Sequence, residues 1–153
     1  MTYWDRKLVR EQVDRKFEKL RGLADLGFDK GWIRMIREAL GMSSAQLGKR
    51  VGIDQSRISR LENAEVDGDL KLSSLRKIAE GLNMKFVYGF IPNDSLETIV
   101  LQQARKIALE RMQKLNHTMR LEQQELGEAE KERALDDMIQ KILVEEPREF
   151  WDK

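Results

Sequence analysis

The stretch that most constrains this chain is residues 41–63, which predicts two short helices joined by a glycine turn. Ser43 is placed to cap the first helix, and Gly52 stands where a left-handed residue must end it. Asp54 is then the expected N-cap of a second helix, which buries Ile58. The caps, the turn and the apolar spacing agree with one another, so this stretch predicts more than a chance pairing of amphipathic helices.

The second of these helices begins with polar side chains, the arrangement by which a helix contacts bases in the DNA major groove. Gln binds adenine and Arg binds guanine through two hydrogen bonds each, so Gln55, Ser56 and Arg57 are the predicted base-reading residues. Phosphate contacts fix the register of a protein on DNA without reading its sequence. The predicted phosphate contacts come from Arg60, Ser44 and, more weakly, Lys49.

Charge is distributed unevenly along the chain, although the formal net charge is only +1. Residues 31–60 carry six Lys and Arg against two Asp and Glu, a net charge of +4. Residues 116–153 carry six against eleven, a net charge of −5. Phosphate attracts the first segment and repels the second, so only the first is expected to approach DNA.

Residues 31–83 resemble the lambda-repressor-like, or XRE, helix-turn-helix family. The matching segments are Ser-Ser-Ala-Gln-Leu at 43–47, Val-Gly-Ile at 51–53, Ile-Ser-Arg-Leu-Glu-Asn at 58–63 and Leu-Ser-Ser-Leu-Arg-Lys-Ile-Ala-Glu-Gly-Leu-Asn at 72–83. The resemblance implies a five-helix DNA-binding domain in which Arg37 and Glu62 form a partly buried, structural ion pair. Ala64 departs from the usual glycine of the family, which affects only the loop that follows.

The segments around this domain predict one more helix and one strand. Apolar residues at helical spacing predict an amphipathic helix that ends near Gly22, followed by a linker to Lys30. Residues 84–92 are rich in aromatic and β-branched types, which favours a β-strand. No second strand is evident, so we expect this one to pair with its copy in a homodimer, unless it is a buried connector. The predicted dimer contacts are Phe86, Val87, Tyr88 and Phe90.

Two further helices are expected after the strand. Asp94 to Glu97 has the form of a capping box, and an apolar stripe behind it predicts a helix of 25 to 30 residues. A last helix, about 128–144, has an apolar side that either docks a partner or packs in the core. The predicted fold class is therefore mainly α. It is divided into an N-terminal helix and linker (1–30), the helix-turn-helix domain (31–83), the dimerisation strand (84–92) and a helical partner-binding or dimerisation region (93–153).

Over most of its length the chain also resembles the group called mobile mystery protein A. The matching segments include Gly-Trp-Ile-Arg-Met-Ile-Arg-Glu-Ala-Leu-Gly at 31–41, Gln-Gln-Ala-Arg-Lys at 102–106 and His-Thr-Met-Arg-Leu-Glu at 117–122. This resemblance implies an antitoxin encoded beside a Fic-domain protein, an enzyme that transfers AMP. Thr118 and Glu122 partly match the inhibitory motif of such antitoxins, whose Glu pairs with an active-site arginine; in an acidic helix Glu122 could equally be solvated.

Catalysis is not expected, since the chain has one histidine, no cysteine and no glycine-rich phosphate loop. No cofactor or metal is predicted, and no apolar run is long enough to cross a bilayer, so we expect a cytoplasmic protein that binds operator DNA. Three functions remain open: a DNA-binding antitoxin that represses its own operon, a stand-alone dimeric regulator, and an adaptor whose helix-turn-helix does not bind DNA.

Overall fold

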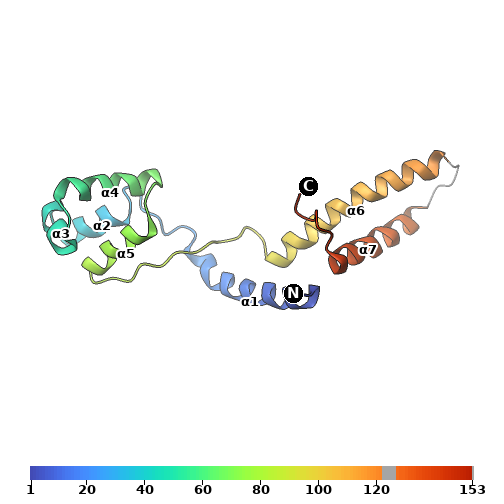
Figure 1. Cartoon of the computed structure of the whole chain (residues 1–153), viewed down its shortest axis with the longest axis horizontal. Helices are drawn as coiled ribbons and strands as arrows, with labels where there is room; N and C mark the ends of the chain where they lie inside the picture. The colour runs from blue at the N-terminus through green and yellow to red at the C-terminus, as the bar shows by residue number, and fades with distance from the viewer. Residues whose placement is uncertain (122–126, 153) are drawn as a thin grey trace. The chain divides into compact units, whose positions relative to one another are not determined.

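The computed structural model describes residues 1–121 and 127–152, with side chains given for 1–118 and 127–152. Seven α-helices and one short 3-10 helix account for the regular structure in this part of the chain, so the mainly α fold class is confirmed. The helices form two compact units. Residues 22–90 make up the first, which contains α2 to α5, and residues 1–21 and 91–153 make up the second, which contains α1, α6 and α7 (Figure 1).

The unit of residues 22–90 is a bundle of four helices: α2 (Trp32–Ala39), α3 (Ser44–Val51), α4 (Gln55–Asp67) and α5 (Leu72–Gly81). The prediction of five helices between 31 and 83 was therefore wrong by one. Each helix contributes apolar side chains to one core, whose buried members are Ile33, Leu47, Val51, Ile58, Ile78 and Leu82. Burial of this apolar surface is the main term that holds the bundle together.

The turn between α3 and α4 follows the sequence pattern closely. Ser43 and Gln46 form a capping box at the start of α3, and Gly52 ends it with a φ of 78°. The Asp54 side chain accepts a hydrogen bond from the Arg57 backbone N–H and so caps α4. At Gly48 an added Cβ would lie 2.5 Å from the Ile53 carbonyl oxygen, so only glycine lets the turn pack this closely.

A buried carboxylate ties α4 to α2. The Glu62 side chain is 2 % exposed, and its Oε1 accepts a hydrogen bond of 2.6 Å from Arg37 Nε. Its Oε2 accepts from Arg37 Nη2 at 3.2 Å and from Arg34 Nε at 3.1 Å. Arg37 also donates to the Met42 carbonyl oxygen, which extends the network to the loop before α3. Burial raises the pKa of Glu62, but the two guanidinium groups outweigh it and hold the pKa below its ordinary value.

A second glutamate of α4 caps the start of α2. Glu65 accepts hydrogen bonds from the backbone N–H groups of Trp32 (2.8 Å) and Ile33 (3.0 Å), two of the donors that a helix N-terminus leaves unpaired. Gly31 precedes them with a φ of 79°, and a Cβ there would lie 2.8 Å from Glu65 Oε2. Glu62 and Glu65 are three residues apart on α4, so one face of this helix fixes both the side chains and the backbone of α2.

The predicted strand at 84–92 is absent from the described chain, where these residues run without helix or strand (Figure 1). The backbone is nevertheless extended enough to bring the rings of Phe86 and Tyr88 together, 6.2 Å apart and nearly parallel. Phe86 and Val87 line an apolar groove with α2 and α5 of their own unit. A strand needs a partner for its backbone, and residues 1–121 and 127–152 contain no second strand that could supply one.

The other unit is formed by two segments that are far apart in the sequence, residues 1–21 and 91–153. α1 (Tyr3–Leu20) packs against α6 (Leu96–Leu121) and α7 (Glu128–Glu145), which form an antiparallel hairpin (Figure 1). The core side chains come from α6, α7 and the segment after α7: Val100, Ala104, Ile107, Ala108, Ile139, Ile142, Leu143 and Phe150. The apolar stripes of the two C-terminal helices thus bury each other within one chain.

The start of α6 is held by α1. Ser95 rather than the predicted Asp94 is the capping residue, and its Oγ accepts from the Thr98 backbone N–H at 3.0 Å. Asp14 of α1 accepts from the Leu96 backbone N–H at 2.8 Å, and its other oxygen lies 3.4 Å from the N–H of Glu97. One turn away, Arg10 Nε donates to Glu97 at 2.8 Å. α1 therefore contributes polar as well as apolar contacts to this unit.

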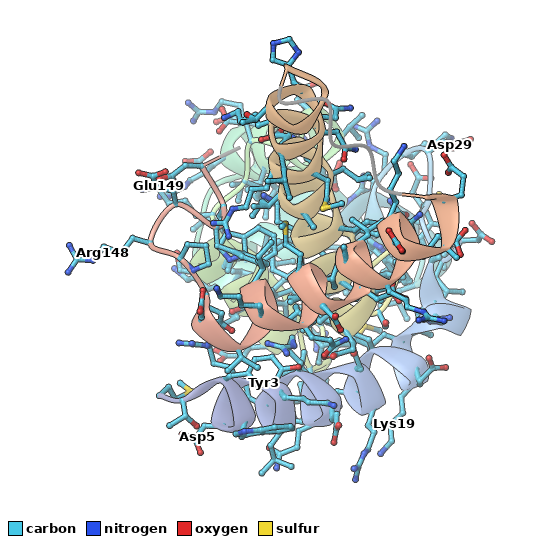
Figure 2. All side chains as sticks on the ribbon, turned by 90° about the vertical axis from the view of Figure 1, so that its right-hand side faces the viewer. Tyr3, Asp5, Lys19, Asp29, Arg148 and Glu149 are labelled. Atoms are coloured by element: carbon cyan, nitrogen blue, oxygen red, sulfur yellow. The ribbon has the colours of Figure 1, made fainter. Side chains whose placement is uncertain are left out.

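The two sides of α1 differ in character. Tyr3 packs against the core formed by α6 and α7, whereas Asp5 and Lys19 point away from α7 in Figure 2. Arg148 and Glu149 project outward from the segment that follows α7 (Figure 2).

Among the described helices, none combines the length and the apolar character that crossing a membrane requires.

The first prediction concerns the buried carboxylate of α4. A Glu62→Gln variant leaves two guanidinium groups without their counter-charge, so we expect the unfolding free energy of the helix-turn-helix unit to fall by about 3 kcal/mol. Because the pKa of Glu62 is lower in the folded chain than the unfolded value of 4.5, its stabilising effect is present above that pH and is lost as the pH falls below it. The variant should therefore lose part of the acid sensitivity of the wild type.

Denaturant unfolding between pH 3 and pH 7, monitored by circular dichroism, measures both effects. Glu38→Gln is the matched control, since this glutamate is exposed on α2 and its substitution should change stability little. Equal stabilities for Glu62→Gln and Glu38→Gln would contradict the prediction.

The second prediction concerns the contact between α1 and α6. Asp14→Ala leaves the Leu96 and Glu97 backbone N–H groups without their carboxylate, and loss of a helix cap costs about 1 kcal/mol. Thermal melting should show the unit of α1, α6 and α7 unfolding earlier, with the helix-turn-helix unit unaffected. Asp14→Asn keeps an acceptor oxygen and should recover much of the loss; identical melting of all three proteins would count against this cap.

Candidate nucleic-acid interface

The first turn of α4 presents its side chains to solvent. Gln55, Ser56 and Arg57 are all exposed, and Ile58 directly after them is fully buried. In the part of the chain that the structure describes, the Gln55 amide and the Arg57 guanidinium have no side-chain hydrogen bond to another residue. The buried Ile58 and the cap at Asp54 fix the backbone of this turn, so its exposed side chains extend from a rigid support.

Ser56 differs from its two neighbours because its hydroxyl is engaged. Ser56 Oγ donates to Asp54 Oδ1 at 2.5 Å, and the same oxygen accepts from the Arg57 backbone N–H at 2.8 Å. These two hydrogen bonds lower the pKa of Asp54, because they stabilise the ionised carboxylate. Ser56 therefore supports the helix cap, and its hydroxyl oxygen remains only as an acceptor.

Two of the predicted DNA contacts, Arg57 and Arg60, lie in the same depression as a third basic residue, Lys71. Arg57 and Arg60 line one shallow depression beside α4, which continues to Lys71 at the start of α5. Asp54 and Asp69 line the same depression, so its three cations are partly offset. Lys71, which directly precedes α5, is not among the contacts predicted from the sequence.

The other predicted phosphate contacts are placed elsewhere on the unit. Lys49 is exposed on the last turn of α3 and lines a second depression with Gln46 and Arg50. Arg50 also donates to the Gly81 carbonyl oxygen at 3.0 Å, which ties α3 to the end of α5. Ser44 is half-buried at the start of α3. The structure thus separates Lys49 from the depression that contains Arg57 and Arg60.

The four residues expected to mediate dimerisation differ in how much of each side chain is exposed to solvent. Val87, Tyr88 and Phe90 are 73 %, 65 % and 80 % exposed, which is unusual for such large apolar side chains. Phe86 is half-buried against its own unit. Three of the four predicted contacts are therefore available to another surface.

The predicted inhibitory pair is described only in part. Thr118 is exposed near the end of α6, and its hydroxyl donates to the Lys114 carbonyl oxygen at 3.1 Å. Glu122 lies outside the described residues.

The comparisons with known proteins bear on the first unit. Residues 33–88 match the family model described as helix-turn-helix. No curated protein and no solved structure matches the chain. The match includes α2 from its second residue, all of α3 to α5 with the turn between α3 and α4, and the extended segment up to Tyr88. Residues 33–88 are thus an XRE-type helix-turn-helix domain, the type found in DNA-binding transcriptional regulators.

Proposed function

We propose that this protein is a sequence-specific DNA-binding transcriptional repressor that acts as a dimer. The observation that carries the proposal is the exposed first turn of α4, held by the Asp54 cap and by Glu62 below it. A helix N-terminus fixed in this way can enter the major groove without losing much conformational freedom on binding. In this proposal Gln55 and Arg57 contact bases, while Arg60, Lys71 and Lys49 contact phosphates.

A dimer would place two such helices on successive major-groove faces, about 34 Å apart. The exposed apolar side chains of Val87, Tyr88 and Phe90 support this part of the proposal, because they extend from a segment whose backbone has no ladder partner in the described chain. Pairing of this segment with its copy would satisfy the backbone and cover the apolar side chains in one step.

The narrower role, antitoxin of a Fic-domain protein and repressor of a shared operon, rests on the sequence resemblance described above. The alternative is a stand-alone dimeric regulator. Co-expression with the protein encoded beside it separates the two, since an antitoxin forms a stable mixed complex with that neighbour. A Glu122→Gly variant then tests whether this residue restrains AMP transfer.

The third prediction concerns base reading by α4. Arg57→Ala should weaken binding to the operator by about 1–3 kcal/mol and change binding to random DNA much less, because a lost guanine contact affects one sequence most. Lys49→Ala should weaken both complexes by a similar factor and reduce the salt dependence of binding, as expected for a phosphate contact.

Fluorescence anisotropy at several salt concentrations, with operator and scrambled duplexes, measures these effects. The operator can be located by footprinting the promoter of the gene itself. An equal loss on both duplexes for Arg57→Ala would argue against base reading by this residue. Failure of the wild-type protein to distinguish the two duplexes would overturn the proposed function.

The fourth prediction concerns dimerisation. Replacing Val87 and Phe90 together by serine should shift the protein from dimer to monomer, because it removes the apolar side chains most exposed on the extended segment. Leu72→Ser is the control, since Leu72 is 42 % exposed on α5 outside that segment. Light scattering after size-exclusion chromatography gives the mass directly. A dimer that persists in the double variant would place the interface elsewhere.

A further inference from the structure

The second unit contains an apolar pocket with two arginine side chains in its wall, the buried Arg10 and the partly exposed Arg6. Its volume is about 320 Å³, within the range of about 300–1,000 Å³ usual for small-molecule sites. It is lined by Met1, Arg6, Val9, Arg10, Leu96, Ile99, Val100, Glu146, Phe150 and Trp151. All of these residues belong to one compact unit, and most of the lining is apolar.

The two arginines retain hydrogen-bond donors that lack acceptors. Arg10 is 9 % exposed, donates through Nε to Glu97 and lies over the Tyr3 ring, 5.8 Å from its centre. Its Nη2 is nevertheless buried without a hydrogen-bond acceptor in the described structure. Arg6 pairs through Nη2 with Glu146, and its Nε is likewise buried and unpaired. Buried polar groups in folded proteins are nearly always hydrogen-bonded, so two orphaned donors beside one pocket indicate a missing acceptor.

The charges around the pocket limit what that acceptor can be. Each guanidinium is already paired with a carboxylate, so the formal charges of Arg6, Arg10, Glu97 and Glu146 cancel. A ligand carboxylate would add a negative charge beside Glu146, and two carboxylates that share a site repel each other. A neutral carboxamide avoids this repulsion, because its carbonyl oxygen accepts from guanidinium and its N–H groups donate to a carboxylate.

We propose that this pocket binds a small apolar molecule that ends in a carboxamide. The aryl or alkyl part of the ligand would contact Val9, Ile99 and Trp151, which are partly exposed around the pocket. The amide would complete the hydrogen bonding of Arg6 and Arg10 next to Glu146. Because the lining comes from α1 as well as from α6 and the C-terminal segment, a bound ligand would stabilise the packing of these elements. The proposal does not depend on DNA binding.

Phenylacetamide is a suitable probe, and phenylacetate is its charged counterpart of nearly the same shape. In the full-length protein with ¹⁵N-labelled arginine, phenylacetamide at millimolar concentration should shift the Nε–Hε signals of Arg6 and Arg10. Other arginines, such as Arg57 on α4, should be unaffected. Phenylacetate should bind at least about tenfold more weakly. Absence of a shift at both arginines, or equal binding of the acid and the amide, would overturn the proposal.

A variant that fills the pocket provides the second test. Ile99→Trp should reduce the affinity for phenylacetamide at least about tenfold while leaving both arginines and their carboxylate partners in place. Leu101→Trp is the matched control on the same helix, because Leu101 is 45 % exposed and does not line the pocket. Val9→Trp fills the same space from α1 if Ile99→Trp melts abnormally. Unchanged binding in a folded pocket-filling variant would show that the probe binds elsewhere.

Discussion

The buried carboxylate of Glu62 is the interaction on which the helix-turn-helix unit depends. It accepts hydrogen bonds from Arg34 and Arg37, and through Arg37 it also orders the loop before α3. A charge so deeply buried is tolerated only because both of its oxygens are paired. The same network orients α4, so the position of the exposed first turn that would contact DNA is set by a buried residue two turns further along the helix.

Glu65 adds a second kind of constraint, which acts on the backbone. By capping Trp32 and Ile33 it fixes where α2 begins, and it leaves room at Gly31 only for a residue without a side chain. The polar contacts of α4 with α2 and the apolar core around Ile58 therefore support the same arrangement. Agreement between local and long-range contacts is what gives a small helical unit a single structure.

The structural features that could be predicted from the sequence were mostly those formed by residues close together in the chain. Ser43, Gly52 and Asp54 act within a few residues of themselves, so their caps and turn were evident from spacing. Glu65 and Asp14 form caps across 32 and 82 residues, and no local pattern marks such pairs. The strand at 84–92 was predicted from composition, which describes a segment suited to a sheet but cannot supply the neighbour that a sheet requires.

The division of the chain into two units has a consequence for its synthesis. Residues 22–90 are contiguous, so the helix-turn-helix unit can fold as soon as it leaves the ribosome. α1 emerges before it, yet the partners of Tyr3, Arg10 and Asp14 lie on α6, on α7 and in the segment around Phe150, close to the other terminus. α1 is thus made before the helix-turn-helix unit, but it completes its contacts only after α6, α7 and the segment around Phe150 have been made.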